Sequence, residues 1–279
     1  MLDRKLVLNN PSLIRSHLEK RNASAEALAT LEQLIEVMGK RRVLQNETDL
    51  LRGQRNELSK QIGPLMKAGK RDEAEPLRNQ VKEVGNTLTE LEEQRKDLAT
   101  EEDQLLLSLP NLVADDVPEG KSETENVEIR SWGTPANYDF EVKDHVTLGE
   151  EAGIFDFERA AKLSGARFPV YRGTGALLER ALINFFLDRA TQQNGYTELV
   201  VPYIVSRTTM TGTGQLPKFE ADLFRLTGEV NGEDAFLIPT AEVPVTNLHR
   251  DEILKEAQLP LAYTTFTPCF RSEAGSYGK

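Results

Sequence analysis

The sequence has little cysteine, little histidine and no long apolar run, and each shortage excludes a class of protein. Among 279 residues there is one cysteine, Cys269, which excludes an internal disulfide framework and a multi-cysteine zinc site. The three histidines, His17, His145 and His249, lack metal-ligand spacing, so we expect surface or capping roles and no metal centre. No apolar run approaches the roughly 18 residues of a membrane-spanning helix, and the N-terminus lacks the apolar core of a signal peptide. We therefore expect a cytoplasmic protein without a membrane partner.

The net charge of −11 conceals one basic segment. Between Lys40 and Arg71 there are nine basic and three acidic residues, a local charge of +6 that leaves −17 for the rest of the chain. No aromatic residue lies in this segment, so stacking of nucleic-acid bases on it is not expected. Two interpretations remain open: a solvated helix face, or a surface that binds the phosphates of structured RNA.

Two apolar heptad stripes predict a long helical hairpin in the N-terminal third. Leucine or valine occupies every seventh position in two series, at 37, 44, 51, 58 and 65 and at 77, 84, 91, 98 and 105. Near the end of the first series, Pro64 weakens any helix that runs through it, and Gly69, between the two series, marks a turn. Folding the chain near residue 71 pairs Leu58 with Val84, in an antiparallel arm close to 50 Å long at about 1.5 Å per residue.

An acidic segment separates this hairpin from a second region. Residues 115–128 contain six acids and one lysine with Pro118 and Gly120, which is typical of a linker. Beyond it the pattern predicts helices at 176–194 and 241–249 and strands at 196–205, 223–226, 235–238 and 263–271. Strands joined by turns as well as by helices predict a mixed or antiparallel sheet, so the fold class is α+β. Neither G-x-G-x-x-G nor G-x-x-x-x-G-K-[ST] occurs, which excludes the common glycine-rich phosphate loops.

Three stretches of the second region together resemble bacterial-type seryl-tRNA synthetases, which are class II aminoacyl-tRNA synthetases. They are the run from Leu163 to Pro202, similar to the entry segment and motif 1; Thr-Ala-Glu-Val-Pro at 240–244, similar to the serine-binding loop; and Phe-Arg-Ser-Glu-Ala-Gly at 270–275, similar to the start of motif 2. The basic hairpin is similar to the tRNA-binding arm of that family. In this order the elements cover essentially all 279 residues.

The resemblance implies three segments and a reaction. Residues 1–109 would form a tRNA-binding arm, 110–136 a linker, and 137–279 the N-terminal part of a class II catalytic domain. The implied activity is activation of L-serine by ATP with Mg²⁺ to seryl-adenylate, followed by transfer to tRNA(Ser), with tRNA(Sec) as a second acceptor. Motif 1 implies a homodimer with Pro202 at the interface, since a proline inside a strand removes a ladder donor. The tRNA contacts are expected at five basic residues, Arg41, Arg42, Arg52, Arg55 and Lys60.

The residues of the two short motifs suit that chemistry. Arg271 would bridge the serine carboxylate and the α-phosphate of ATP, with Ser272 and Glu273 also at the ATP. Thr240, Ala241 and Glu242 would contact serine. Ordinary roles are the alternatives: an ion pair for Arg271, a cross-strand partner for Glu273, and a helix cap for Thr240. Cys269 is expected to be a buried packing thiol.

The sequence departs from the family pattern at its end. It stops at Lys279, inside the stretch similar to motif 2, whereas the family continues to motif 3, so we expect a C-terminally truncated enzyme with an incomplete sheet. Three alternatives are a catalytically inactive tRNA-binding fragment, an amino acid:carrier-protein ligase, and a structural coiled coil. Relatives of the carrier-protein type lack the long hairpin, and a plain coiled coil leaves both short motifs unexplained.

Overall fold

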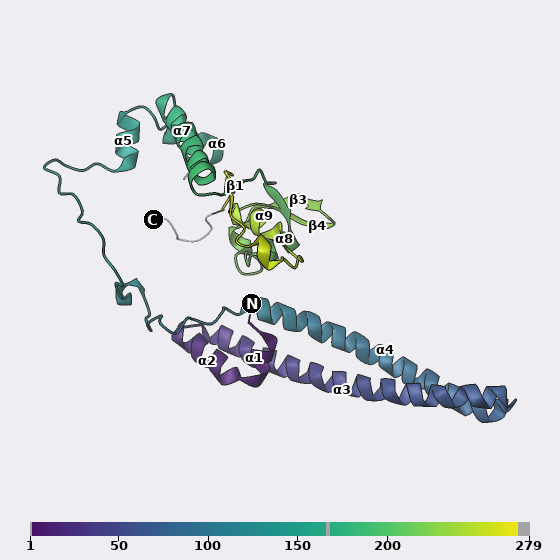
Figure 1. The fold of residues 1–279 in the computed structure, drawn as a ribbon. Helices are drawn as coiled ribbons and strands as arrows, with labels where there is room; N and C mark the ends of the chain where they lie inside the picture. The colour runs from purple at the N-terminus through teal and green to yellow at the C-terminus, as the bar shows by residue number, and fades with distance from the viewer. Residues whose placement is uncertain (1, 166–167, 273–279) are drawn as a thin grey trace. The chain divides into compact units, whose positions relative to one another are not determined.

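A computed structural model describes residues 2–165 and 168–272 of the chain (Figure 1). The chain divides into two compact units between Ser131 and Trp132. Each unit is described by itself.

The predicted hairpin is confirmed and dominates the first unit (Figure 1). Its helices are α3 (Ala25–Lys67) and α4 (Arg71–Ser108). The side chain of Ser24 accepts a hydrogen bond from the amide of Ala27 and so caps α3, and Gly69 closes the turn at a φ of +74°. Pro64 lies in the last turn of α3, where its missing amide removes only one helical hydrogen bond, so the helix continues through it to Lys67.

Polar side chains that join α3 to α4 fix the register of the hairpin. Arg41 contacts Glu102, Gln45 contacts Arg95, and Arg52 contacts Glu92, and these three pairs are centred between residues 70 and 72. This is the register that the heptad stripes predict. A fourth pair near the base, Gln33 with Glu101, is centred at residue 67. Thr48, which interrupts one stripe, is fully buried and donates its hydroxyl to the carbonyl of Leu44 at 2.6 Å.

The apolar core of the first unit lies at the base of the hairpin. Two short helices, α1 (Arg4–Asn9) and α2 (Pro11–Lys20), pack there. The core is formed by nine buried residues: Leu2, Val7, Ile14, Leu18, Leu31, Leu34, Met38, Leu106 and Leu109. The chain that follows α4 stays attached to α2, because Arg21 donates to the carbonyl of Asn111 at 2.8 Å and the amide of Val113 donates to His17 Nδ1 at 3.2 Å. A 3₁₀ turn, η1 (Glu123–Glu125), follows.

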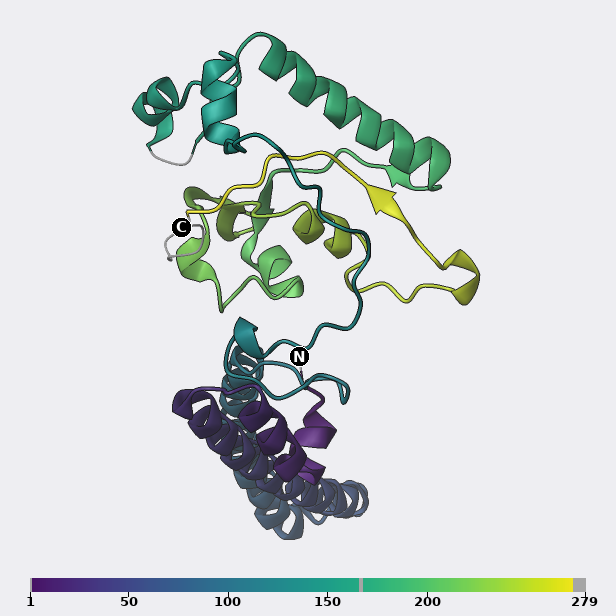
Figure 2. The same cartoon turned by 90° about the vertical axis from the view of Figure 1, so that its left-hand side faces the viewer.

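The second unit begins with helices and continues into small sheets (Figure 2). Its helices are α5 (His145–Glu151), α6 (Phe157–Ser164), α7 (Thr174–Asp188), α8 (Arg207–Gly212) and α9 (Glu242–Asn247), and a π-helical turn, η2 (Arg189–Gln193), extends α7. Two 3₁₀ turns are η3 (Glu220–Asp222) and η4 (Glu256–Gln258).

Both sheets of the second unit are small. One pairs β1 (Thr197–Glu198) in parallel with β5 (Tyr263–Thr264), and the other is antiparallel in the order β2–β4–β3, with β2 (Ile204–Ser206), β4 (Glu233–Leu237) and β3 (Arg225–Val230). The core beneath the antiparallel sheet contains Val205, Met210, Leu216, Leu223, Phe236, Ile238 and Val243. The predicted α+β class with a mixed or antiparallel sheet is confirmed.

Two predicted strands were too long. The single strand expected at 196–205 is two strands in different sheets, β1 and β2, and the exposed Pro202 lies between them. A proline has no amide to donate to a ladder, so the chain changes sheets there. The strand expected at 263–271 is regular only at Tyr263–Thr264, because the residues after it bond singly to other segments instead of joining a ladder.

Candidate functional site

The two short motifs of the second unit lie side by side. The amide of Phe270 donates to the carbonyl of Ile238 at 2.8 Å, and Arg271 Nε donates to the carbonyl of Pro239 at 3.3 Å. The segment that carries Arg271 is thereby held against the residues that lead into Thr240. The structure thus brings together Arg271 and the Thr240–Glu242 segment, although 32 residues separate Arg271 from Pro239.

Ser272, the residue after Arg271, is hydrogen-bonded to a different segment, η3. The amide of Ser272 donates to the carbonyl of Asp222, and its hydroxyl donates to the carbonyl of Ala221, both at 3.0 Å. Ser272 therefore has a structural contact with η3. Glu273 lies outside the described residues, and its role at ATP stays a prediction.

The Thr240–Glu242 segment forms the N-terminal end of α9. Glu242 is exposed at the first position of the helix, and its amide donates a long bond of 3.4 Å to the Thr240 hydroxyl. The N-cap position of α9 is Ala241, and no side chain caps the helix, so Thr240 makes only this long local bond, while the Glu242 carboxylate remains open to solvent. Val243 and Pro244 are buried directly after it and hold the start of α9 against the core.

A charged network that the sequence did not predict lies under η3. Arg207 at the start of α8 bonds both Glu220 and Asp234, and its guanidinium carbon lies 5.2 Å from the centre of the Phe236 ring. The hydrogen bond from Arg207 lowers the pKa of Asp234 and likewise that of Glu220. Because η3 carries the carbonyls that hold Ser272, this network supports the segment beyond Arg271. The partners lie 13 and 27 residues from Arg207, so no local pattern identifies them.

A second polar group joins α9 to its neighbours. Asn247 donates to the carbonyl of Thr209 on α8 at 2.9 Å. His249 bonds the Tyr263 hydroxyl at 3.0 Å and the Glu252 carboxylate at 2.8 Å. The end of α9 is therefore tied to both α8 and β5.

The five basic residues expected to contact tRNA differ in their surroundings. Arg41 pairs with Glu102 at 2.8 Å, Arg52 with Glu92 at 2.7 Å, and Lys60 with Glu57 at 2.5 Å. Arg42 and Arg55 are exposed and have no ion pair within the residues that the structure describes. Charge on this surface is thus partly compensated, which the count of basic residues alone did not indicate.

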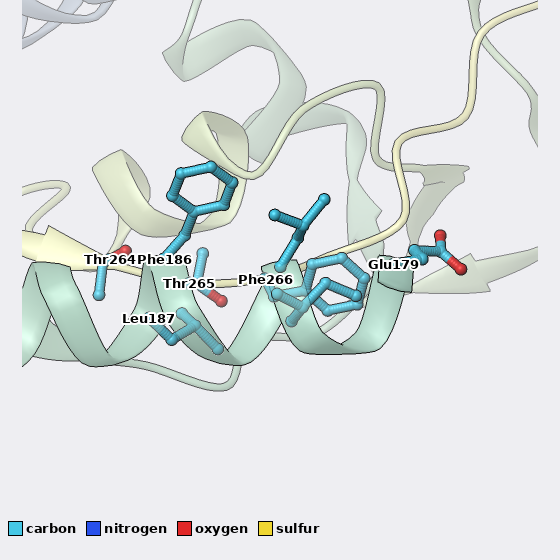
Figure 3. Close-up of a pocket in the computed structure, with 8 residues that line it drawn as sticks. Glu179, Phe186, Leu187, Thr264, Thr265 and Phe266 are labelled. Atoms are coloured by element: carbon cyan, nitrogen blue, oxygen red, sulfur yellow. The ribbon is translucent and has the colours of Figure 1, made fainter. Parts of the chain in front are cut away.

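An apolar surface runs along α7. Phe186 is 61% exposed, Leu178 is 56% exposed, and a pocket of about 370 Å³ opens between α7 and the β5 segment. Figure 3 shows Phe186 and Leu187 on α7 facing Thr264, Thr265 and Phe266 across this pocket. Pro202, the predicted interface residue, is exposed and lies between β1 and β2. Val200, two residues before it, is 91% exposed.

One prediction about cysteine was wrong. Cys269 is exposed, and its Sγ contacts Thr267, because the segment before Phe270 is not part of a strand and does not bury alternate residues. Across residues 2–165 and 168–272, no group of three or more histidine, cysteine or acidic side chains is arranged to hold a metal ion. In the same part of the chain no helix has the length and apolarity that crossing a bilayer requires.

Two family models match the chain. Residues 1–113 match the seryl-tRNA synthetase N-terminal domain, and residues 224–278 match the tRNA synthetase class II core domain of the G, H, P, S and T enzymes. The first match contains the hairpin, and the second contains Thr240, Glu242 and Arg271.

Similar proteins cover the whole chain. It is 46% identical to a serine–tRNA ligase of Pseudothermotoga lettingae and 48% identical to one of Caldicellulosiruptor saccharolyticus, in each case over all of this chain and 64% of the relative. The crystal structure of seryl-tRNA synthetase from Pyrococcus horikoshii complexed with ATP superposes with a TM-score of 0.86 at 35% identity, over all of this chain and 65% of that one. The chain thus spans about 64% of the length of the curated relatives it matches. With both family models in the expected order, the chain belongs to the seryl-tRNA synthetase family.

Proposed function

We propose that the protein is a serine–tRNA ligase. One observation carries the proposal: Arg271 is hydrogen-bonded to Pro239, beside the segment Thr240–Glu242, so the two motifs that would handle ATP and serine form one site. The choice of serine as the amino-acid substrate is supported by the relatives, which are named serine–tRNA ligases. If Arg271 and the Thr240–Glu242 segment lay far apart in the structure, that separation would argue against this function.

The first step joins two anions. The serine carboxylate attacks the α-phosphorus of ATP, a P–O bond forms, and pyrophosphate leaves to give seryl-adenylate. The Arg271 guanidinium is exposed and anchored through Nε, so its two terminal nitrogens can bridge the carboxylate and the phosphate. Glu242, exposed at the start of α9, would take the serine ammonium group, and Thr240 with Ala241 would line the same end.

ATP is the proposed second substrate, supported by the Pyrococcus horikoshii relative, which was crystallised with ATP. Ser272 and Glu273 would complete its contacts from this chain. Magnesium would arrive on the ATP phosphates, since it keeps several waters and needs few protein ligands. That mode of binding is compatible with the absence of a ready metal cluster in the described parts of the chain.

In the second step a terminal ribose hydroxyl of tRNA attacks the seryl carbonyl and AMP leaves. We propose that residues 1–109 bind tRNA(Ser), and also tRNA(Sec), through the five basic residues of α3 and that residues 110–136 link this arm to the catalytic part. The arm has no aromatic residue from Lys40 to Arg71, so recognition would use phosphates and shape. We also propose that the protein works in the cytoplasm.

We further propose a homodimer through α7 and the segment around Pro202. The support is the exposed apolar surface of α7, whose large side chains would be costly to leave in water. The parallel pair β1–β5 continues this surface, so the second copy would cover the pocket beside Phe186 as well.

The decisive experiment is serine-dependent exchange of pyrophosphate into ATP by the complete protein. Arg271→Ala should lower the exchange rate by about 10²- to 10³-fold, the usual effect of removing one positioned group that stabilises transition-state charge. Arg130→Ala, an exposed arginine without an ion pair in the described chain, is the matched control and should leave the rate unchanged. Unchanged exchange in Arg271→Ala would reject the site, and exchange stimulated equally by other amino acids would reject serine.

A further inference from the structure

Glu102 on α4 is a carboxylate buried by two arginines. Its side chain is 2% exposed, Arg4 Nε of α1 lies 2.7 Å from one oxygen, and Arg41 Nη1 of α3 lies 2.8 Å from the other. Both carboxylate oxygens therefore have a charged donor, and three helices meet at one group. A buried charge needs such partners, since an unpaired carboxylate inside a protein is strongly unfavourable.

The two arginines are not equivalent. Arg4 also bonds Asp103, so its guanidinium is shared between two acids. Arg41 has Glu102 as its single ion-pair partner within the described chain, and its side chain is 39% exposed. One edge of the Arg41 guanidinium is thus fixed by a buried group, while part of the side chain stays exposed to solvent.

We propose that Glu102 is a positioning residue for tRNA binding, which acts by holding Arg41 in an orientation ready for a phosphate. This rests on the proposed function of the arm. An arginine fixed before binding loses less side-chain entropy when a phosphate arrives. A buried partner holds it better than an exposed one, because water and salt screen the exposed pair.

Arg52 and Glu92 provide the internal comparison. They pair at 2.7 Å across the same two helices, but the two side chains are 41% and 46% exposed. Glu92 therefore constrains Arg52 weakly and mainly adds negative charge to the surface. Glu92→Gln should leave tRNA affinity unchanged or make it stronger.

The sign of the effect distinguishes positioning from charge. Glu102→Gln removes a negative charge, and by Coulomb attraction alone a polyanion would then bind more tightly. If Glu102 positions Arg41, Glu102→Gln should instead weaken tRNA binding about threefold to tenfold, as expected for freeing one long side chain. Arg41→Gln should weaken binding at least as much, and the double variant should bind no more weakly than Arg41→Gln.

The measurement is the dissociation constant of tRNA(Ser) for the full chain at fixed salt, with thermal unfolding recorded for every variant. Arg4→Gln separates stability from positioning, because it breaks the other bond of Glu102 and leaves the Arg41 bond in place. It should lower the unfolding temperature and change affinity less than about twofold. Tighter binding by Glu102→Gln, additive effects in the double variant, or equal weakening by Arg4→Gln would overturn the proposal.

A further variant tests tRNA binding by the arm separately from the positioning role of Glu102. Replacing residues 45–95 by a short turn removes Arg52, Arg55 and Lys60 but retains Arg41 and Glu102. If that variant binds tRNA(Ser) like the wild type, residues 45–95 are not the binding element, and the proposed role of Arg52, Arg55 and Lys60 is wrong. If it loses binding while Glu102→Gln does not weaken it, the arm stands and the positioning role of Glu102 is wrong.

Discussion

Arg271 Nε donates a hydrogen bond to the backbone carbonyl of Pro239 across 3.3 Å. The acceptor is a main-chain atom, so the bond survives any side-chain change at 239 and depends on the path of the chain alone. It uses the Nε hydrogen and does not occupy the hydrogens of the two terminal nitrogens. This is the geometry expected of an arginine that must be ordered and still bind a substrate.

Glu242→Gln should raise the KM for serine by about tenfold to a hundredfold, since a charge-assisted bond to the serine ammonium would be lost. The KM for ATP should change little, because Glu242 would not contact the nucleotide. Steady-state exchange kinetics with each substrate varied in turn measure both values. Glu229→Gln, an exposed glutamate on β3, is the control. Equal increases in both KM values would contradict a serine-specific contact.

Asp234→Asn should lower the stability of the second unit at neutral pH. Hydrogen bonding to Arg207 lowers the pKa of Asp234 below its ordinary value of 3.8, so the carboxylate stabilises the fold fully above that value. The contribution is lost as the pH falls through the lower, folded-state pKa. The difference between wild type and Asp234→Asn should therefore be constant near neutrality and shrink in acid below about pH 4. Urea unfolding at a series of pH values measures it, with the exposed Asp139→Asn as control.

Gly175→Ala should destabilise α7, by about 1–3 kcal/mol, as overpacking of a closed site usually does. A Cβ at Gly175 would lie 2.9 Å from the backbone oxygen of Ile154, and backbone cannot move aside as a side chain can. Gly85→Ala is the opposite case, since a Cβ there meets nothing within 4 Å. It should stabilise α4 by about 0.5–1 kcal/mol through helix propensity alone. Thermal unfolding followed by circular dichroism distinguishes the two, and a stabilised Gly175→Ala would show that α7 can shift.

Phe186→Glu should dissociate the proposed homodimer. Phe186 is 61% exposed on α7, and a carboxylate in its place would be buried without a partner between two copies. Val43→Glu places the same charge on α3, at a position 63% exposed, and should leave the association state unchanged. Sedimentation velocity over a range of concentrations reports the result. A Phe186→Glu dimer as tight as the wild type would move the interface elsewhere.

The hairpin could be predicted from the sequence because its pattern is local. Heptads at 37–65 and 77–105 specify both helices, and the turn residues specify where the chain reverses. The small sheets could be predicted only in outline, since Thr197 pairs with Tyr263 across a long stretch of chain and no local period encodes that contact. For the same reason the bonds of Arg207 were not foreseen.

The candidate site was predicted through the resemblance of short motifs, and its geometry was not. Residues 240–242 and 271 suggested chemistry by their types, but their proximity became visible only with the bonds to Ile238 and Pro239. Cys269 shows the limit of reasoning from neighbours in sequence. Its apolar surroundings indicated a buried thiol, whereas burial is decided by which segments the chain packs against.

The polar side-chain pairs between α3 and α4 restrict how the two helices can align when the hairpin forms. Apolar heptads alone would permit α4 to slide along α3 by seven residues and still bury leucines. A slip in one direction would set Arg41 against Arg95, two cations, and would leave the Glu102 carboxylate facing the apolar Leu34. Both contacts are unfavourable in a buried seam, so the slipped hairpin is destabilised while its hydrophobic pairing is intact. Polar side-chain pairs between the two helices therefore select one alignment of the arm, which the apolar stripes alone do not specify.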